Sequence, residues 1–362
     1  MARAVPLRDD LVGLTGYHSP QVDVEVRLNT NESPLPPPRE WLAELTDELG
    51  RIAFNRYPDR EATALRAALA EFHGCGPSQV FCANGSNEVL QCLLLAYGGA
   101  GRTAAIFEPT YALHRHIASL TATTVVSGWR APDHRLDLDV VDEVLATARP
   151  TITFLCSPNN PTGRAEPPDV VSHVLERAPG LVVVDEAYGQ FAPYSALDLV
   201  RGGGPGSDRL VVVRTFSKTW SMAACRLGYL VAAPDVVDAC GAVVLPYHLD
   251  AVTQAAGRLA LRHVDAMEAR VATLNEERGR ITAALGGLGV QTWPSDANFV
   301  LFRPLGRAAT EVWHDLLASS VLVRDCSTWP GLDECLRVTV GTPPENDRFL
   351  AALTSSLEGT TP

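Results

Sequence analysis

A lysine, two hydroxyl side chains and an arginine lie close together in residues 211–232. Thr215 and Ser217 precede Lys218, Arg226 follows it, and no acidic residue lies within eight positions of the lysine. Such a lysine is often a solvated surface residue. A lysine kept near cations instead has a lowered pKa and becomes nucleophilic, the condition for a Schiff base with a carbonyl group. The arginine supplies the planar donor group that suits phosphate.

Two further polar motifs follow apolar segments that we expect to be strands. In "NGSNE" (84–88), the amides of Ser86 and Asn87 would open a helix, which is a natural phosphate site. An ordinary helix N-cap is the alternative interpretation. In "SPNNPTG" (157–163), Asn160 would direct an amide into the same cleft, although the segment need be no more than a turn.

The motif "VVVDEAYGQF" places Asp185 at the end of a fully apolar strand, with Tyr188 three residues later. A carboxylate at the rim of a buried sheet is costly unless it is paired or hydrogen-bonded, although a helix N-cap would also explain it. Taken together, the motifs supply an imine-forming lysine and a carboxylate for a pyridinium nitrogen. They also supply donors for a phenolate oxygen and a phosphate site, which are the groups that pyridoxal phosphate needs.

The elements that must position these side chains are short apolar segments alternating with helix-like segments. This alternation predicts an α/β fold with a largely parallel sheet buried on both faces. Ligands bind at the carboxyl ends of strands in such sheets, so the polar loops could converge on one pocket. The expected strands of this sheet are 79–83, 103–107, 151–156, 180–185, 209–214 and 227–232.

Beyond residue 246 the pattern changes to a long helical stretch over residues 251–285 and a smaller α+β unit. Its expected strands are 298–302, 321–324 and 336–340. Residues 61–73 also show helical spacing.

Composition excludes several classes of protein. The chain has 362 residues, 46% of them hydrophobic and 20% charged, which suits a soluble protein with two domains. A net charge of -12 without basic runs argues against a nucleic-acid partner. The first ten residues contain no apolar signal segment, and no apolar run is long enough to span a membrane. Eight cysteines without a CxxC pair predict reduced thiols, no metal site and a cytoplasmic location.

Several motifs in order resemble the class I/II pyridoxal-phosphate aminotransferases of fold type I, over nearly the whole chain. They are "RYPD", "NGSNE", "EPTY", "SPNNPTG", "DEAYGQF", "TFSK...RLGY", "SDANF" and "LRVTVGT". "RYPD" and "PYHLDAVTQAA" resemble the histidinol-phosphate branch of this family. The resemblance implies a homodimer and a large domain with a mostly parallel seven-stranded sheet, accompanied by a smaller α+β domain. The implied divisions are an N-terminal arm with part of the small domain (1–40), the large domain (41–245) and the small domain (246–362).

The resemblance also implies roles for single residues. Lys218 would attach the cofactor, pyridoxal 5′-phosphate, and shuttle a proton, and Asp185 would keep the pyridine nitrogen protonated. Tyr188, with Asn160, would bond the phenolic oxygen of the ring, and Tyr111 would stack on it. The implied phosphate contacts are Ser86, Asn87, Thr215, Ser217, Arg226 and, from the partner subunit, Tyr57. The implied substrate contacts are Tyr17, Arg324 and Arg337.

The expected activity is transfer of an amino group between an anionic, histidinol-phosphate-like amine and 2-oxoglutarate. Trp220, Met222 and Cys225 stand where this family usually has small residues, which suggests altered walls of the substrate pocket. The alternative is therefore a related enzyme that performs β-elimination, as a carbon–sulfur lyase, or decarboxylative deamination. A non-catalytic sensor is less consistent with an intact Lys218, and no GxGxxG motif supports a nicotinamide-dependent oxidoreductase.

Overall fold

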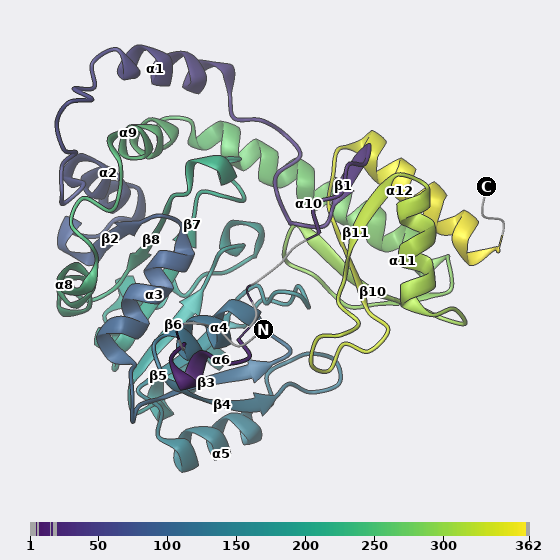
Figure 1. Cartoon of the computed structure of the whole chain (residues 1–362), viewed down its shortest axis with the longest axis horizontal. Coiled ribbons are helices and arrows are strands. Elements are labelled where there is room, and N and C mark those ends of the chain that lie inside the picture. Colours follow the sequence, from purple (N-terminus) through teal and green to yellow (C-terminus); the bar gives the residue numbers. More distant parts are fainter. Residues whose placement is uncertain (1–4, 6, 15, 17–19, 360–362) are drawn as a thin grey trace.

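The computed structural model describes residue 5, residues 7–14, residue 16 and residues 20–359. Its elements form two lobes, one around a seven-stranded sheet and a smaller one around a five-stranded sheet (Figure 1). The helices are α1 (Arg39–Leu49), α2 (Thr63–His73), α3 (Ser86–Tyr97), α4 (Ala112–Leu120), α5 (Leu138–Ala148), α6 (Pro168–Arg177), α7 (Leu197–Gly202), α8 (Pro234–Val243), α9 (Ala251–Ala260), α10 (Val264–Gly286), α11 (Ala309–Ala318) and α12 (Pro343–Leu357).

The seven-stranded sheet is parallel except for the two pairings of β8. Its strands are, in spatial order, β2 (Val80–Ala83), β8 (Gly228–Val231), β7 (Leu210–Thr215), β6 (Leu181–Asp185), β5 (Ile152–Cys156), β3 (Thr103–Glu108) and β4 (Thr124–Trp129). Successive strand residues face opposite sides, so Val182 and Val184 pack into one core and Val183 into the other. This architecture confirms the α/β expectation.

Helices cover both faces of this sheet. Apolar residues of α3, α4 and α8 pack on one face, and those of α2, α5, α6 and α7 contribute to the core on the other. The apolar pattern predicts six of the seven strands but not β4, an edge strand that contains a glycine and is only partly buried. Among the helices of the described residues, none is both long and apolar enough to cross a membrane.

The five-stranded sheet combines one strand from the N-terminal part of the chain with four strands from the C-terminal part. Its strands are, in spatial order, β1 (Val26–Leu28), β11 (Val321–Asp325), β12 (Leu336–Thr339), β10 (Phe299–Pro304) and β9 (Val290–Thr292). β1 pairs in parallel with β11, so this N-terminal strand lies in the C-terminal lobe, beside α12 (Figure 1). The antiparallel pairing of β11 and β12 sets Arg324 directly opposite Arg337.

The helical stretch expected over residues 251–285 is two helices rather than one. α9 packs on α1 and α2 in the larger lobe, and Trp41 Nε1 donates to the carbonyl oxygen of Ala256 at 3.0 Å. α10 then runs across to the smaller lobe (Figure 1). Residues 261–263 between them contain neither glycine nor proline, so local sequence carries no signal for the break. The domain boundaries at residues 40 and 245 stay predictions.

Candidate active site

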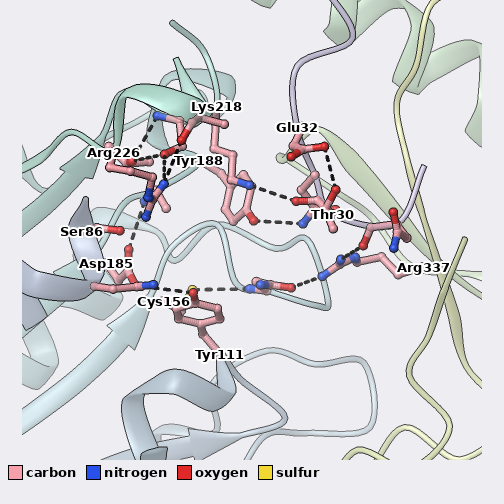
Figure 2. Close-up of a pocket in the computed structure, with 18 of the residues that line it drawn as sticks. Thr30, Glu32, Ser86, Tyr111, Cys156, Asp185, Tyr188, Lys218, Arg226 and Arg337 are labelled. Atoms are coloured by element: carbon pink, nitrogen blue, oxygen red, sulfur yellow. Dashed lines mark hydrogen bonds between the residues drawn. The ribbon is translucent and has the colours of Figure 1, made fainter. Parts of the chain in front are cut away.

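The carboxyl ends of three neighbouring strands open into a cavity of about 420 Å³. Cys156 ends β5, Asp185 ends β6 and Thr215 ends β7, and all three line the cavity. Residues 29–32 and Arg337 of β12 close it from the side of the smaller lobe (Figure 2). The residues expected in the site that line this cavity are Ser86, Asn87, Tyr111, Asn160, Asp185, Tyr188, Thr215, Ser217, Lys218, Arg226 and Arg337.

Lys218 follows β7 and extends its amine across the cavity toward Thr30 (Figure 2). Its Nζ donates to the backbone carbonyl oxygen of Thr30 at 3.0 Å. Burial lowers the pKa of Lys218 from 10.5 to about 8, and the positive charge of Arg337 adds to this effect, while Glu32 opposes it. The amine is therefore much more often neutral, and so nucleophilic, than an exposed lysine. Lys218 is also the only lysine in the chain.

Asp185 is held in place by a histidine. His114 Nε2 and Asp185 Oδ2 are 3.1 Å apart, and the backbone N–H of Ala187 donates to the other carboxylate oxygen at 3.2 Å. The imidazole of His114 is stacked on Phe154 with a centroid separation of 4.8 Å. Both polar side chains are buried, so the cavity has a fixed carboxylate at its base.

Tyr188 and Asn160 connect this base to the smaller lobe. The phenol oxygen of Tyr188 accepts a hydrogen bond from Asn31 Nδ2 at 2.9 Å. Burial raises the pKa of Tyr188, which keeps the phenol protonated. Asn160 Oδ1 accepts from Arg337 Nη1 at 2.5 Å, and Arg337 Nη2 donates to the carbonyl oxygen of Asn29 at 2.8 Å.

The other end of the cavity is a cluster of donors around the start of α3. Gly85 precedes Ser86 in a left-handed conformation with φ 79°. A Cβ at Gly85 would lie 2.7 Å from Arg226 Nη2, so a larger residue would push the guanidinium away from the start of α3. Ser217 Oγ accepts from Thr215 Oγ1 at 3.0 Å and from Arg226 Nη1 at 3.3 Å. Hydroxyls, an arginine and the positive end of a helix together form a site for a phosphate-sized anion.

Comparison with known proteins identifies the family. A model described as aminotransferase class I and II matches residues 23–353. The chain belongs to the class I and II aminotransferase family. It is 49% identical over 379 residues to the histidinol-phosphate aminotransferase of Frankia casuarinae, covering 99% of this chain and 92% of that protein. The histidinol-phosphate aminotransferase of Thermobifida fusca is 48% identical over 361 residues, with 96% and 95% coverage.

A solved structure supports the fold. The histidinol-phosphate aminotransferase of Sinorhizobium meliloti, in complex with pyridoxal-5′-phosphate, superposes with a TM-score of 0.89 at 22% identity, covering 99% of each chain. The present aminotransferase therefore has fold type I, as its motifs predict.

Pyridoxal phosphate is the cofactor of this aminotransferase, as of its family. The residues of the cavity fit it. The donors around α3 match its phosphate, Asp185 matches a protonated ring nitrogen, and the amine of Lys218 lies between these two regions and Arg337 (Figure 2). Glycine at position 228 is part of this fit, because a Cβ there would lie 2.1 Å from the backbone nitrogen of Ser86.

Three expected residues are not in the wall of the cavity. Tyr57 is 79% exposed, and its ring is stacked on Tyr247 at 4.4 Å. Arg324 is buried beside Arg337, with its guanidinium 5.3 Å from the ring centre of Trp329. Tyr17 lies outside the described residues. The roles expected of these three residues stay predictions.

The bulky residues after Lys218 do not narrow the cavity of the aminotransferase. Trp220 and Met222 are buried in the main core, and the Trp220 ring is stacked on Phe216 at 5.2 Å. The small side chains of Ala223 and Ala224 line the cavity instead. The interpretation that Trp220 and Met222 alter the walls of the substrate pocket is therefore wrong.

Three residues of the site are not predicted from the sequence. His114 stands about one turn after Tyr111, the N-cap residue of α4, and this spacing brings the two rings together at 5.4 Å. Asn31 and Glu32 line the cavity from the N-terminal segment, where a proline-rich context gives no sign of a site. These two lie in the cavity because β1 and β11 pair, a contact between residues almost 300 positions apart.

Proposed function

We propose that the protein is a histidinol-phosphate aminotransferase, which moves the amino group of histidinol phosphate to 2-oxoglutarate. The observation that carries this proposal is the buried and uncompensated charge of Arg337. Its guanidinium is buried in the cavity wall opposite Lys218, and among the described residues it forms no ion pair with a carboxylate. A buried cation without a counter-charge is costly, so a substrate phosphate or carboxylate would be drawn to it.

The relatives support the choice of substrate. Proteins that are 45% to 49% identical to this chain over almost its full length bear the name histidinol-phosphate aminotransferase. One cavity must accept both the amine and the 2-oxo acid in turn. Arg337 suits both, because the amine carries a phosphate and 2-oxoglutarate carries carboxylates, and a guanidinium can bind either in a bidentate manner.

The proposed roles follow from the groups that each residue presents. Pyridoxal phosphate, when bound, supplies an electron sink for the bond-breaking step at the substrate carbon. Lys218 attaches the cofactor and moves the proton between the substrate carbon and the cofactor carbon. Asp185 keeps a proton on the ring nitrogen, and His114 orients the carboxylate. Asn160 and Tyr188 bind the phenolic oxygen of the ring.

The remaining contacts hold the cofactor in place. Tyr111 packs against the face of the ring, and its hydroxyl donates to Asn87 Oδ1 at 3.3 Å in this structure. The phosphate would be bound by Ser86, Asn87, Thr215, Ser217 and Arg226. Fixing both ends of the cofactor orients the bond that breaks, which is the main contribution a protein makes to this chemistry.

We further propose a twofold homodimer in which Tyr57 reaches the phosphate of the partner subunit. The support is an exposed aromatic pair, Tyr57 with Tyr247. Phe54 and Leu245, close to these two residues in the sequence, are also 72% and 76% exposed. Exposed apolar side chains of this size are typical of protein interfaces. Arg324 and Tyr17 are proposed as further substrate contacts, on the resemblance alone.

The test mixes purified enzyme with histidinol phosphate and 2-oxoglutarate and follows glutamate. Turnover supports the proposal, and histidinol without its phosphate is the matched control, since it lacks the group that Arg337 would bind. Release of pyruvate and ammonia from cysteine conjugates, without glutamate formation from histidinol phosphate, would instead establish the carbon–sulfur lyase alternative.

A further inference from the structure

Asn31 lies in the cavity wall between Tyr188 of the larger lobe and Thr339 of β12, and all three side chains are buried. Its Nδ2 donates to the phenol oxygen of Tyr188 at 2.9 Å. Its Oδ1 accepts from Thr339 Oγ1 at 3.0 Å. The three side chains therefore form a continuous hydrogen-bonded chain that joins the two lobes.

Thr339 fixes which way the amide of Asn31 points. The backbone N–H of Asn31 donates to Thr339 Oγ1 at 3.0 Å, and the hydroxyl gives its own hydrogen to Asn31 Oδ1. With this hydrogen on Asn31 Oδ1, the amide nitrogen faces Tyr188. The backbone of Asn31 is also held on its other side, because Asn298 Nδ2 donates to its carbonyl oxygen at 3.2 Å.

The direction of the bond to Tyr188 has a chemical consequence. A phenol has one hydrogen to donate. Because Asn31 occupies the phenol oxygen as a donor, Tyr188 cannot give its hydrogen to Asn31 and keeps it for another acceptor. Burial raises the pKa of Tyr188, so this hydrogen is present at neutral pH. The phenolic oxygen of pyridoxal phosphate is the acceptor that the proposed function supplies.

We propose that Asn31 is a positioning residue that directs the hydroxyl of Tyr188 onto the phenolic oxygen of the cofactor. It also ties this hydrogen bond to β12, because Thr339 lies two residues after Arg337 on that strand. The inference rests on the proposed roles of Tyr188 and Arg337. It adds a residue to the site and gives the donor direction that those roles require.

The neighbours of Asn31 strengthen the link between the two lobes. The carbonyl oxygen of Thr30 accepts from Lys218 Nζ at 3.0 Å, and that of Asn29 accepts from Arg337 Nη2 at 2.8 Å. Three consecutive residues thus contact the amine, the phenol and the substrate arginine (Figure 2). An anion that moves Arg337 would move the same segment that orients Tyr188.

The variant Asn31→Asp tests the donor direction with almost no change in shape. Asn31 has φ 56°, a left-handed conformation that both asparagine and aspartate tolerate. A carboxylate only accepts, so the hydrogen of Tyr188 would turn to it and leave the cofactor. Tyr188 stabilises the deprotonated form of the cofactor's phenolic oxygen, and its loss favours the protonated form. The pH midpoint of the absorbance change of the bound cofactor, without substrate, should rise by about one pH unit.

Two control variants separate the effect of the hydrogen-bond direction from the effect of a new negative charge and from a general disturbance of the fold. Asn298→Asp introduces the same buried carboxylate beside Asn31 without touching Tyr188, and it should shift the midpoint much less. Thr339→Val keeps the side-chain size but removes the bond that orients Asn31, and it should give a smaller rise. If Asn31→Asp does not fold, Thr339→Val carries the test.

Double substitution decides whether Asn31 acts through Tyr188. Tyr188→Phe should raise the pH midpoint. Adding Asn31→Ala to this variant should change the midpoint no further, because the effects of substitutions within one hydrogen-bonded chain are not additive. A Tyr188→Phe protein with an unchanged midpoint refutes the proposed role of Tyr188. Two outcomes overturn only the inference about Asn31. In the first, the midpoint rises in Tyr188→Phe but not in the Asn31 and Thr339 variants. In the second, the shifts of the single variants add in full in the double variant.

Discussion

The two sides of the cavity are built differently. On the side proposed for the cofactor, Asp185 and the cluster of hydroxyls and arginine around α3 follow strands of one sheet, and their side-chain partners belong to the same lobe. His114 holds Asp185, and Ser217 is bonded to Thr215 and Arg226. The ring carboxylate and the donors around α3 are therefore held within the larger lobe, whereas Lys218 and Tyr188 are also bonded to the N-terminal segment.

The side proposed for the substrate depends on how the lobes meet. Arg337 belongs to the smaller sheet, yet its hydrogen bonds go to Asn160 of the larger lobe and to Asn29 of the N-terminal segment. From this difference we expect substitutions on the cofactor side to change the chemistry and the binding of the cofactor. Substitutions on the second side should change substrate affinity and leave the cofactor in place.

The largest effect is expected for Lys218→Ala. Loss of the proton shuttle should reduce kcat/KM by about 10⁴-fold, the upper range for a positioned acid–base group. Borohydride reduction of the wild-type protein should fix one pyridoxyl group per chain. Because the chain has a single lysine, peptide mass mapping has only Lys218 and the α-amino group to distinguish. A label on the α-amino group alone would refute the proposed attachment.

Arg337→Ala should have the next largest effect and tests the second side. Loss of a charge-assisted hydrogen bond to the substrate should lower kcat/KM for the phosphate-bearing amine by about 10- to 150-fold. The dissociation constant of the cofactor should change less, because Arg337 contacts Asn160 but none of the phosphate-binding groups around α3. Arg303→Ala is a matched control, since Arg303 lies on the neighbouring strand β10 and does not line the cavity. Equal losses of cofactor and substrate affinity in Arg337→Ala would remove the distinction between the two sides.

The sequence predicts the groups at strand ends better than the groups that long-range pairing brings into the cavity. Lys218, Asp185 and Ser86 were predictable because each stands at the end of an apolar strand or shortly after it, and the ends of parallel strands meet at one edge of a sheet. Asn31 was not predictable, because its place depends on the pairing of β1 with β11. Such long-range contacts leave no local pattern.

The errors of the sequence interpretation have the same origin. The break between α9 and α10 and the inward packing of Trp220 reflect contacts between lobes and core layers rather than local propensity. An apolar residue next to a reactive lysine can line a cavity or fill the core, and residue type alone does not distinguish the two.

A pH dependence of intermediate size is expected on the cofactor side. The neutral amine of Lys218 is the form proposed to react with pyridoxal phosphate, and burial lowers the pKa of this amine to about 8. Between pH 7 and pH 9 the rate of cofactor attachment to the apoprotein should rise about tenfold and then level off, as the neutral fraction approaches one. Stopped-flow absorbance measures this rate. A rise of about a hundredfold without a plateau would show that Lys218 has the pKa of an exposed lysine.

The smallest effect is expected for Tyr57→Phe, which tests whether the cofactor side is complete within one chain. The phenyl ring keeps the stacking on Tyr247, so the mass of the proposed dimer by light scattering should not change. Only the hydroxyl is lost, and with it the proposed hydrogen bond to the phosphate in the partner subunit. The dissociation constant of the cofactor should rise about fivefold, the worth of a single hydrogen bond.

Tyr97→Phe is the matched control for this prediction. Tyr97 lies at the far end of α3, so this variant should bind the cofactor like the wild type. A monomeric mass for fully active wild-type protein, or unchanged cofactor affinity in Tyr57→Phe, would mean that one lobe of one chain supplies every phosphate contact. The exposed pair of Tyr57 and Tyr247 would then need another explanation.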